Sequence, residues 1–192
     1  MERLEYWNKY YDKRKYPDNP SDFAKFCLEY LDHWKEVTLL DIGCGNGRDS
    51  YFFAYNGLNV IGVDNSDIVQ SLKVRDNVKF FQSDVSSLAN QKVDYVYARF
   101  FLHAITQEEE DILFKWIAEN LNKGGLFLSE SRTINDELYN KPSDHYRRFL
   151  DKDALVKRLE GHGFKINYVK EDTGFAPLYN EDPKLVRIVA EK

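Results

Sequence analysis

A short apolar run leads directly into a glycine-rich turn near residue 43, and this junction constrains the fold more than any other segment. Residues 37–42 predict a buried strand, and residues 48–55 predict the helix that follows. Gly43, Gly45 and Gly47 let the backbone turn tightly and approach a ligand without a Cβ in the way. The free N–H groups at a helix start favour a carboxylate or a phosphate. The junction therefore predicts a strand–turn–helix unit with a ligand site beside the turn.

Further strands alternate with helices along the chain. Apolar runs predict these strands at residues 59–64, 78–82, 93–98, 126–130, 164–169 and 185–190. Strand–helix alternation at this spacing specifies parallel strands joined by right-handed crossovers. Only a loop with Pro177 and Pro183 separates the last two runs, so we expect them to pair antiparallel at one edge. Ligands bind such sheets beyond the carboxyl ends of the strands.

Capping residues mark the expected helices. The first 36 residues read as helical, and Ser21 caps the second of two helices there. The apolar face of that helix consists of Phe23, Phe26, Cys27, Tyr30, Leu31 and Trp34. Ser66 opens a further expected helix, Thr106 begins a capping box for a helix that runs to about Leu121, and Asp151 caps the last helix.

Composition places the chain among globular proteins. Its 192 residues are 43% hydrophobic and 31% charged, which suits one compact domain. The net charge of −5 argues against a nucleic-acid partner. Cys27 and Cys44 fit no metal-site or disulfide spacing, and no apolar run indicates a signal peptide or membrane span. We expect a cytoplasmic protein without a membrane partner, as a monomer or homodimer.

Two acidic residues follow the strands next to the glycine turn. Asp64 closes the second expected strand, where a carboxylate can accept hydrogen bonds from both hydroxyls of a ribose. Asp84 follows the third strand and is placed to bind an adenine amino group, with Val85 packing on the ring. These positions indicate a cofactor that contains adenosine. The alternative for Asp64 is a purely structural turn cap.

The glycine spacing distinguishes between adenosine cofactors. A dinucleotide fingerprint places its third glycine one residue beyond Gly47, which argues against a nicotinamide dehydrogenase. With Asp41 two residues before Gly43, the segment resembles motif I of the class I S-adenosylmethionine-dependent methyltransferases. Asp64 and Asp84 lie where that family has the acidic residues that bind the ribose and the adenine of the cofactor. The resemblance covers roughly residues 37–192.

This resemblance implies a fold, a cofactor and a set of binding residues. The fold is an α/β, Rossmann-like seven-stranded sheet of order 3-2-1-4-5-7-6, with strand 7 antiparallel and helices on both faces. The cofactor is S-adenosyl-L-methionine, with S-adenosyl-L-homocysteine as product. Residues 1–36 would form a lid over a methyltransferase domain at 37–192. The implied cofactor residues are Asp41, Gly43, Cys44, Gly45, Gly47, Arg48, Asp64, Asn65, Asp84, Val85, Arg99, Trp7 and Tyr11. For the lid aromatics, ordinary core packing is the alternative.

Basic and aromatic side chains gather after the fourth and fifth strands, where an acceptor would lie. They are Arg99, His103, Arg132, His145, Tyr146, Arg147 and Arg148. Because a guanidinium matches a carboxylate or phosphate with two hydrogen bonds, these residues indicate a small, polar, anionic acceptor. The alternative is that some of the arginines pair with Glu130, Asp136 or Asp144.

The implied reaction is an in-line displacement at a sulfonium methyl, catalysed mainly by positioning and desolvation. A neutral hydroxyl would need a general base, and His103 or His145 suits this role because imidazole titrates near neutral pH. The alternative for His103 is a packed or hydrogen-bonded histidine. An ionised oxygen needs only arginines such as Arg99 to orient it. The sequence shows no metal-binding constellation. We therefore expect O-methylation with Arg99, His103 and His145 at the catalytic centre.

Two looser resemblances concern the acceptor. Residues 99–103, 130–132 and 145–148 resemble a bacterial subgroup encoded near surface-glycan and capsule genes, which implies a sugar or phosphoramidate acceptor. The cofactor half also resembles the tellurite-resistance methyltransferases, which implies a tellurium, selenium or thiol nucleophile as the alternative. A protein that binds the cofactor and transfers nothing is a second alternative.

Overall fold

One sheet runs through the computed structural model, which describes residues 3–13, 19–31, 36–143, 145–177 and 181–192. Its strands are β1 (Thr38–Ile42), β2 (Asn59–Asp64), β3 (Val78–Gln82), β4 (Val93–Arg99), β5 (Leu121–Arg132), β6 (Lys165–Asp172) and β7 (Leu185–Glu191). Their order is β3-β2-β1-β4-β5-β7-β6. The strands β1 to β5 run parallel, and β7 pairs antiparallel with β5 and β6. The expected order is confirmed.

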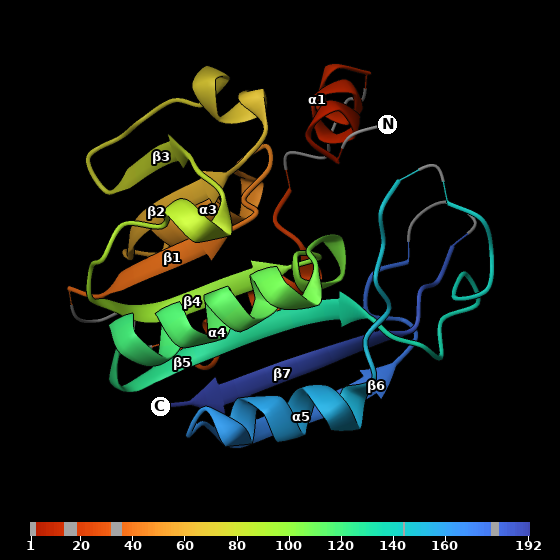
Figure 1. Cartoon of the computed structure of the whole chain (residues 1–192). Coiled ribbons are helices and arrows are strands. Elements are labelled where there is room, and N and C mark those ends of the chain that lie inside the picture. Colours follow the sequence, from red (N-terminus) through yellow and green to blue (C-terminus); the bar gives the residue numbers. More distant parts are fainter. Residues whose placement is uncertain (1–2, 14–18, 32–35, 144, 178–180) are drawn as a thin grey trace.

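Helices cover both faces of this sheet. They are α1 (Arg3–Lys13), α2 (Asp22–Leu28), α3 (Arg48–Tyr55), α4 (Gln107–Asn120) and α5 (Lys152–Gly161), with the 3-10 helices η1 (Asp67–Ser71), η2 (Val85–Ser87) and η3 (Leu102–Ala104). Residues of α2 and α3 belong to one hydrophobic core, and residues of α4 and α5 belong to the other. Figure 1 shows α4 and α5 lying along the front of the sheet.

The two cores arise from the alternation of side chains along each buried strand. Leu39 of β1 packs in the core that contains Phe53 of α3, whereas Leu40 packs in the core that contains Phe114 of α4. Neighbouring residues of a strand point to opposite faces, so a strand covered on both sides is apolar throughout. The short run at 37–42 is such a strand.

The capping residues act largely as predicted. Ser21 accepts a hydrogen bond from the Ala24 N–H (3.0 Å), the capping box at Thr106 is complete, and Asp151 accepts from the Ala154 N–H (2.8 Å). Ser66 is different: its hydroxyl donates to Asp64 instead of capping, and the helix that follows is the one-turn η1.

Some boundaries differ from the expected ones. The strand expected at 126–130 spans Leu121–Arg132, because α4 passes directly into β5 at Leu121. Helix α4 therefore ends one residue earlier than expected. The first 36 residues contain two helices, and Trp34 of the expected apolar face lies outside the described residues.

The carboxyl ends of the parallel strands lie together at one end of the molecule. In Figure 1 the arrows of β4 and β5 point toward α1 and the segment that follows β5, whereas the C-terminus lies at the opposite end. A site at this end of the molecule can therefore contain both the predicted residues of α1 and the predicted residues that follow the strands. Within the described ranges, no helix has the length and apolar character needed to cross a membrane.

Candidate active site

A cavity of about 980 Å³ opens at the carboxyl ends of the parallel strands. Its size suits a drug-sized ligand. The sequence-predicted residues that line it are Trp7, Tyr11, Asp41, Gly43, Cys44, Gly45, Arg48, Asp64, Asn65, Asp84, Val85, Arg99, His103, Arg132, His145, Tyr146 and Arg147. Gly47 and Arg148 are the two predicted residues that do not line it.

The glycine turn lies directly against this cavity. Gly43 and Gly45 have positive φ angles of 73° and 52°. A Cβ at Gly43 would lie 2.5 Å from Cδ2 of Phe101, and a Cβ at Gly45 would collide with the Tyr11 hydroxyl. Both the backbone conformation and the close approach therefore require glycine. Gly47, also with positive φ, serves instead as the N-cap of α3.

Asp41 lies buried beneath the turn. The Ser50 hydroxyl of α3 donates to its carboxylate at 2.5 Å. Burial raises the pKa of Asp41 to about 8, against the opposing effect of the Ser50 hydrogen bond, and the carboxylates of Asp49 and Asp64 add to the rise. At pH 7 the Asp41 carboxyl is therefore mostly neutral, and a positive charge entering the cavity would favour its ionised form.

Asp64 fixes the turn from the end of β2. One carboxylate oxygen accepts from the Gly45 N–H at 2.9 Å. The other accepts from the N–H and the hydroxyl of Ser66, at 2.9 and 2.6 Å. Asn65, next in the chain, also lines the cavity. The residue that the sequence predicts as a ribose ligand thus also holds the glycine turn in shape.

Asp84 caps η2 at the edge of the cavity. Its Oδ1 accepts from the Ser86 hydroxyl (2.7 Å) and the Ser87 N–H (3.0 Å). The Ser86 hydrogen bond in particular lowers the pKa of Asp84, so this carboxylate is ionised at neutral pH. Val85 beside it is buried in the α4 core and lines the cavity.

Aromatic residues of α1 form the wall opposite the sheet. Tyr6, Trp7, Tyr10 and Tyr11 all line the cavity. Their rings contact one another at centroid distances of 5.2 to 6.3 Å. Arg3 forms an ion pair with Glu109 of α4, which ties α1 to the body of the protein. On the other side of α1, Asn8 exchanges two hydrogen bonds with Asp67 of η1.

A buried polar cluster that was not predicted from the sequence lies at the base of the cavity. Asp49 of α3 accepts from the N–H and hydroxyl of Ser21, both at 2.7 Å, and from the Tyr97 hydroxyl at 2.8 Å. All three residues line the cavity. The inward position of Tyr97 follows from the alternation in β4, but its partner Ser21 is 76 residues away, so no local pattern indicated the cluster.

Two arginines share one buried carboxylate beside this cluster. Glu130 of β5 accepts from Arg99 Nε at 3.0 Å and from Arg187 Nε at 2.7 Å. The Arg187 guanidinium also donates to the Phe175 carbonyl and lies 4.2 Å from the centroid of that ring. Because Phe175 lines the cavity, this network connects Arg99 to the segment after β6. The sequence identified Arg99 but gave no signal for Arg187.

The remaining predicted arginines have different surroundings. Arg132 pairs with Asp136, one of the acids expected if the arginines do not bind the acceptor, and also with Glu181. Arg148 pairs with Glu110 of α4 and donates to the carbonyls of Leu102 and Ile105, which directs it away from the cavity. Its expected place in the acceptor set has no support in this geometry. Asp144, the third expected partner, lies outside the described residues.

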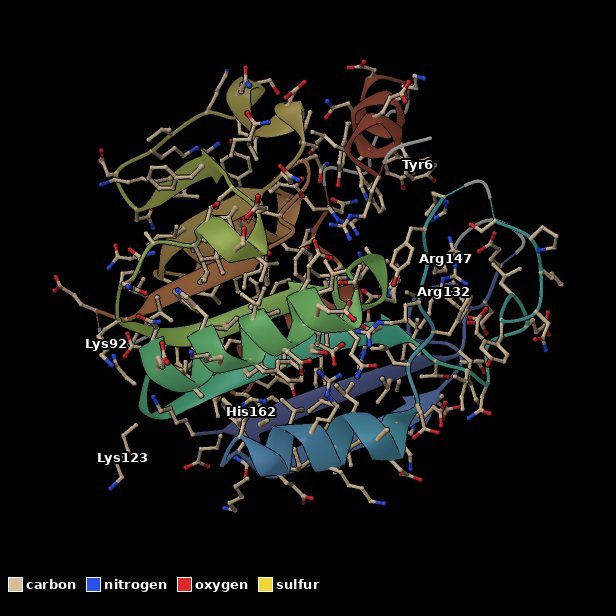
Figure 2. All side chains as sticks on the ribbon, viewed as in Figure 1. Tyr6, Lys92, Lys123, Arg132, Arg147 and His162 are labelled. Carbon is tan, nitrogen blue, oxygen red and sulfur yellow. The ribbon has the colours of Figure 1, made fainter. Side chains whose placement is uncertain are left out.

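Arg147 and the two histidines are the remaining residues that the sequence predicts to bind the acceptor. Arg147 donates to His145 Nε2 at 3.1 Å, while its own Nε is buried without a hydrogen-bond partner among the described residues. His103 is buried on η3 and accepts the Arg132 N–H at Nδ1 (3.2 Å). Figure 2 shows Arg147 and Arg132 at the carboxyl end of the sheet, with Tyr6 of α1 above them.

A strained residue shapes the turn after β4. Phe100 has a positive φ of 55°, which is costly for a side chain other than glycine. Its N–H donates to the Glu130 carbonyl at 2.8 Å, and the Arg99 guanidinium lies 4.2 Å from its ring centroid. This conformation brings Phe101 beneath Gly43. Within the described part of the chain, no cluster of three or more His, Cys, Asp or Glu side chains could hold a metal ion.

Comparisons with known proteins agree with this geometry. Residues 9–169 match a family model described as a methyltransferase domain. The chain is 30% identical over 164 residues to the ribosomal protein arginine N-methyltransferase rmt3 of Schizosaccharomyces pombe, which is 74% of this chain but 28% of that protein. The chain thus spans less than a third of that relative's length.

Solved structures share the fold. A SAM-dependent methyltransferase from Methanosarcina mazei superposes with a TM-score of 0.73 at 19% identity, covering 87% of this chain and 96% of the other. The 1,6-didemethyltoxoflavin-N1-methyltransferase of Burkholderia thailandensis, solved with its substrate and S-adenosylhomocysteine, gives a TM-score of 0.74 at 20% identity, covering 99% and 86%. The chain belongs to the class I S-adenosylmethionine-dependent methyltransferases.

Proposed function

We propose that this chain transfers the methyl group of S-adenosylmethionine to an oxygen of a small anionic acceptor. The observation that carries the proposal is the gathering of cationic and imidazole side chains on one side of the cavity, in a chain of net charge −5. The residues concerned are Arg99, His103, Arg132, His145 and Arg147. Guanidinium groups bind carboxylate and phosphate oxygens through paired hydrogen bonds.

We assign the cofactor to the half of the cavity beside the glycine turn. Asp64 would hold the ribose hydroxyls and Asp84 the adenine, while the backbone at Gly43 and Gly45 would approach the amino-acid end. A backbone cradle that a Cβ would fill supports this assignment, as does a volume of about 980 Å³ that accommodates cofactor and acceptor together. Cys44, Arg48 and Asn65 would complete the cofactor wall.

We assign the N-terminal region, residues 1–36, to a lid over this cofactor, with the aromatic residues of α1 as the covering part and α2 anchored in the core against α3. The position of Trp7 and Tyr11 on the cavity wall supports a lid over ordinary core packing, because core aromatics would be directed into the sheet rather than into a cavity. The bound cofactor supplies an activated methyl group, so the chain's own residues need only orient the acceptor and exclude water. The aromatic residues of α1 would exclude water from the cofactor.

The charges on the acceptor side argue for an anion over the other acceptor types. A cationic acceptor such as an arginine side chain would face Arg99 and Arg147, while the nearby acids Glu130 and Glu181 already pair with arginines of this chain. A neutral thiol or a tellurium nucleophile would make no use of the positive charge of Arg147, which no carboxylate of the described residues pairs with. A phosphoramidate or an acidic sugar of a surface-glycan precursor has the required chemistry.

The test is a turnover measurement on a panel of acceptors. The full chain is incubated with S-adenosylmethionine and, in separate reactions, a sugar phosphate, a uronic acid, a sugar phosphoramidate, an arginine peptide and a small thiol, and release of S-adenosylhomocysteine is measured. We expect turnover with an anionic oxygen acceptor only. Turnover confined to the arginine peptide or the thiol contradicts the proposal, and cofactor binding without any turnover favours a protein that transfers nothing.

A further inference from the structure

His103 is held in one orientation beside the acceptor side of the cavity. It follows β4 on η3, and only 6% of its surface is exposed. Its Nδ1 accepts the Arg132 N–H at 3.2 Å, and its carbonyl accepts the Arg148 N–H at 2.7 Å. Because both the backbone and the ring are held by backbone N–H groups of neighbouring segments, the ring has a fixed orientation with Nε2 as its other polar atom.

This hydrogen bond determines which nitrogen carries the proton. A backbone N–H can donate to Nδ1 only where Nδ1 has its lone pair, so the neutral ring is protonated at Nε2. Burial, together with the positive charges of Arg147, Arg132 and Arg99 and the neighbouring His145, holds the pKa of His103 well below its usual value. The ring therefore stays neutral at pH 7 and offers an N–H donor. Nε2 has no hydrogen-bond acceptor among the described residues, and His103 lines the cavity.

Arg147 brings a positive charge to the same place, with Glu181 and Asp136 acting on it from beyond ion-pair distance. The other predicted arginines are paired: Arg99 with Glu130, Arg132 with Asp136 and Glu181, and Arg148 with Glu110. Arg147 has no carboxylate partner within the described ranges, and its Nε is buried without a hydrogen bond. Of the charged groups around His103, Arg147 lowers the pKa of its imidazole most. Among the described residues, His103 Nε2–H and Arg147 Nε–H thus are donors without an acceptor.

We propose that His103 Nε2–H and the Arg147 guanidinium form an oxyanion subsite that holds a phosphate-type group of the methyl acceptor, with His103 as a hydrogen-bond donor and not as a general base. The inference rests on the proposed function for the statement that the bound anion is the acceptor. A phosphate-type group suits the site because it has several oxygens, so two can be held by donors while another faces the methyl group. The C–O bond then forms as the C–S bond breaks, the bonding pair stays on sulfur, and no proton has to leave the acceptor.

Nuclear magnetic resonance tests the donor state without any acceptor. The chain contains four histidines, so ¹⁵N-histidine labelling of the full protein gives few signals, and His103→Gln assigns the one of interest. We expect His103 to show protonated Nε2 and unprotonated Nδ1 throughout pH 6 to 8, with a shift of the Nε2–H signal when inorganic phosphate is added. A protonated Nδ1, or titration of His103 within this range, overturns the proposal.

Matched variants separate the donor role from a base role and from a structural one. Glutamine at position 103 places an amide N–H near the position of Nε2 but cannot act as a base, whereas leucine removes both polar atoms. Asparagine keeps an acceptor for the Arg132 N–H and loses the distal donor. With the protein saturated with S-adenosylhomocysteine, calorimetry with inorganic phosphate should show an approximately tenfold loss of affinity for His103→Leu, His103→Asn and Arg147→Gln.

His103→Gln should keep phosphate affinity within about threefold of the unaltered protein, and Arg75→Gln, on an exposed residue outside the cavity, should leave it unchanged. Equal phosphate affinity in all variants overturns the subsite. If an acceptor from the panel is turned over, a loss of kcat by two orders of magnitude or more in His103→Gln shows that His103 is a base and also overturns the proposal. A panel without turnover contradicts the proposed function alone, because the phosphate and nuclear magnetic resonance measurements need no acceptor.

Discussion

The ring of Tyr6 stacks on the imidazole of His145, with the ring centroids 4.1 Å apart and the ring planes inclined by 14°. Tyr6 belongs to α1, and His145 belongs to the segment that follows β5. The contact joins the N-terminal helix to the acceptor side across the mouth of the cavity that both residues line. The proposed lid and the proposed acceptor side are therefore linked through the ring contacts of His145 with Tyr6 and Trp7.

Tyr6→Ala should weaken cofactor binding by loosening this closure. An aromatic pair contributes about 0.5–1.5 kcal/mol, so we expect the Kd for S-adenosylhomocysteine to rise roughly two- to tenfold. Amide hydrogen exchange in α1 should accelerate at the same time. Calorimetry and exchange mass spectrometry measure the two effects, and Tyr6→Phe, which keeps the ring, is the control. An unchanged Kd with unchanged exchange in Tyr6→Ala would show that α1 is held by other contacts.

Asp64→Ala should weaken cofactor binding more strongly. The carboxylate holds the glycine turn through the Gly45 N–H, and it is the proposed ligand of the ribose hydroxyls. Loss of such hydrogen bonds costs about 1–3 kcal/mol, which corresponds to a roughly 5- to 150-fold higher Kd for S-adenosylhomocysteine. The exposed Asp76→Ala is a matched control of the same charge change outside the cavity. Similar Kd values for the two variants would refute the assignment.

The fold could be predicted from the sequence because its determinants are local. The apolar runs gave every strand to within a few residues, except for β5, and Ser21, Thr106 and Asp151 fixed helix starts through caps that involve the next three residues. The start of β5 was missed because α4 runs into it without a loop, and Gly124 and Gly125 interrupt the apolar pattern inside the strand. The position of the glycine turn against the cavity followed from the same local patterns.

The pairing of side chains could not be predicted in this way. Glu130 pairs with Arg187 across 57 positions and Asp49 with Tyr97 across 48, and many other acids in the sequence would have suited either partner equally well. For the same reason the sequence placed Arg148 with the acceptor, whereas its hydrogen bonds to η3 hold it beside Glu110 of α4. The local pattern identifies which side chains reach the carboxyl end of the sheet. Tertiary packing determines which of them form ion pairs within the protein and which are left to bind a ligand.

Asp41→Asn should change the pH dependence of stability. The pKa of Asp41 is about 8 in the folded protein, above its ordinary value of 3.8, so the folded state binds this proton more tightly than the unfolded state. The associated stability is fully present below pH 4 and is lost as the pH rises toward 8. Asparagine cannot ionise and keeps an acceptor for Ser50, so the variant should be spared this loss.

The free energy of unfolding by urea, measured without cofactor from pH 4 to 8, tests this expectation. Asp41→Asn should match the unaltered protein near pH 4 and exceed it increasingly above pH 5, by up to about 1.4 kcal/mol per pH unit. Curves that stay parallel over the whole range would show that Asp41 is ionised in the fold. Ser50→Ala, which removes a hydrogen bond to the carboxylate, should move the curve in the opposite direction.

Arg99→Ala should spare cofactor binding and impair use of the acceptor. The Arg99 guanidinium lines the acceptor side, and Glu130 keeps Arg187 as a partner when Arg99 is removed. We expect KM for an anionic acceptor to rise by about tenfold or more, with a Kd for S-adenosylhomocysteine within about twofold of the unaltered protein. Unchanged acceptor kinetics would refute this role, and an equal loss of cofactor affinity would place Arg99 with the cofactor.

Glu130→Gln should be much more harmful to stability, because it leaves the buried guanidinium of Arg187 and the partly buried one of Arg99 without a counter-charge. Removing one partner of a buried ion pair costs about 3–5 kcal/mol. In the double variant Arg99→Met with Glu130→Gln only one cation remains, so the glutamine substitution should cost less there than in the unaltered protein. Urea unfolding of the four proteins gives the coupling energy. Additive free energies would show that Arg99 is not coupled to Glu130.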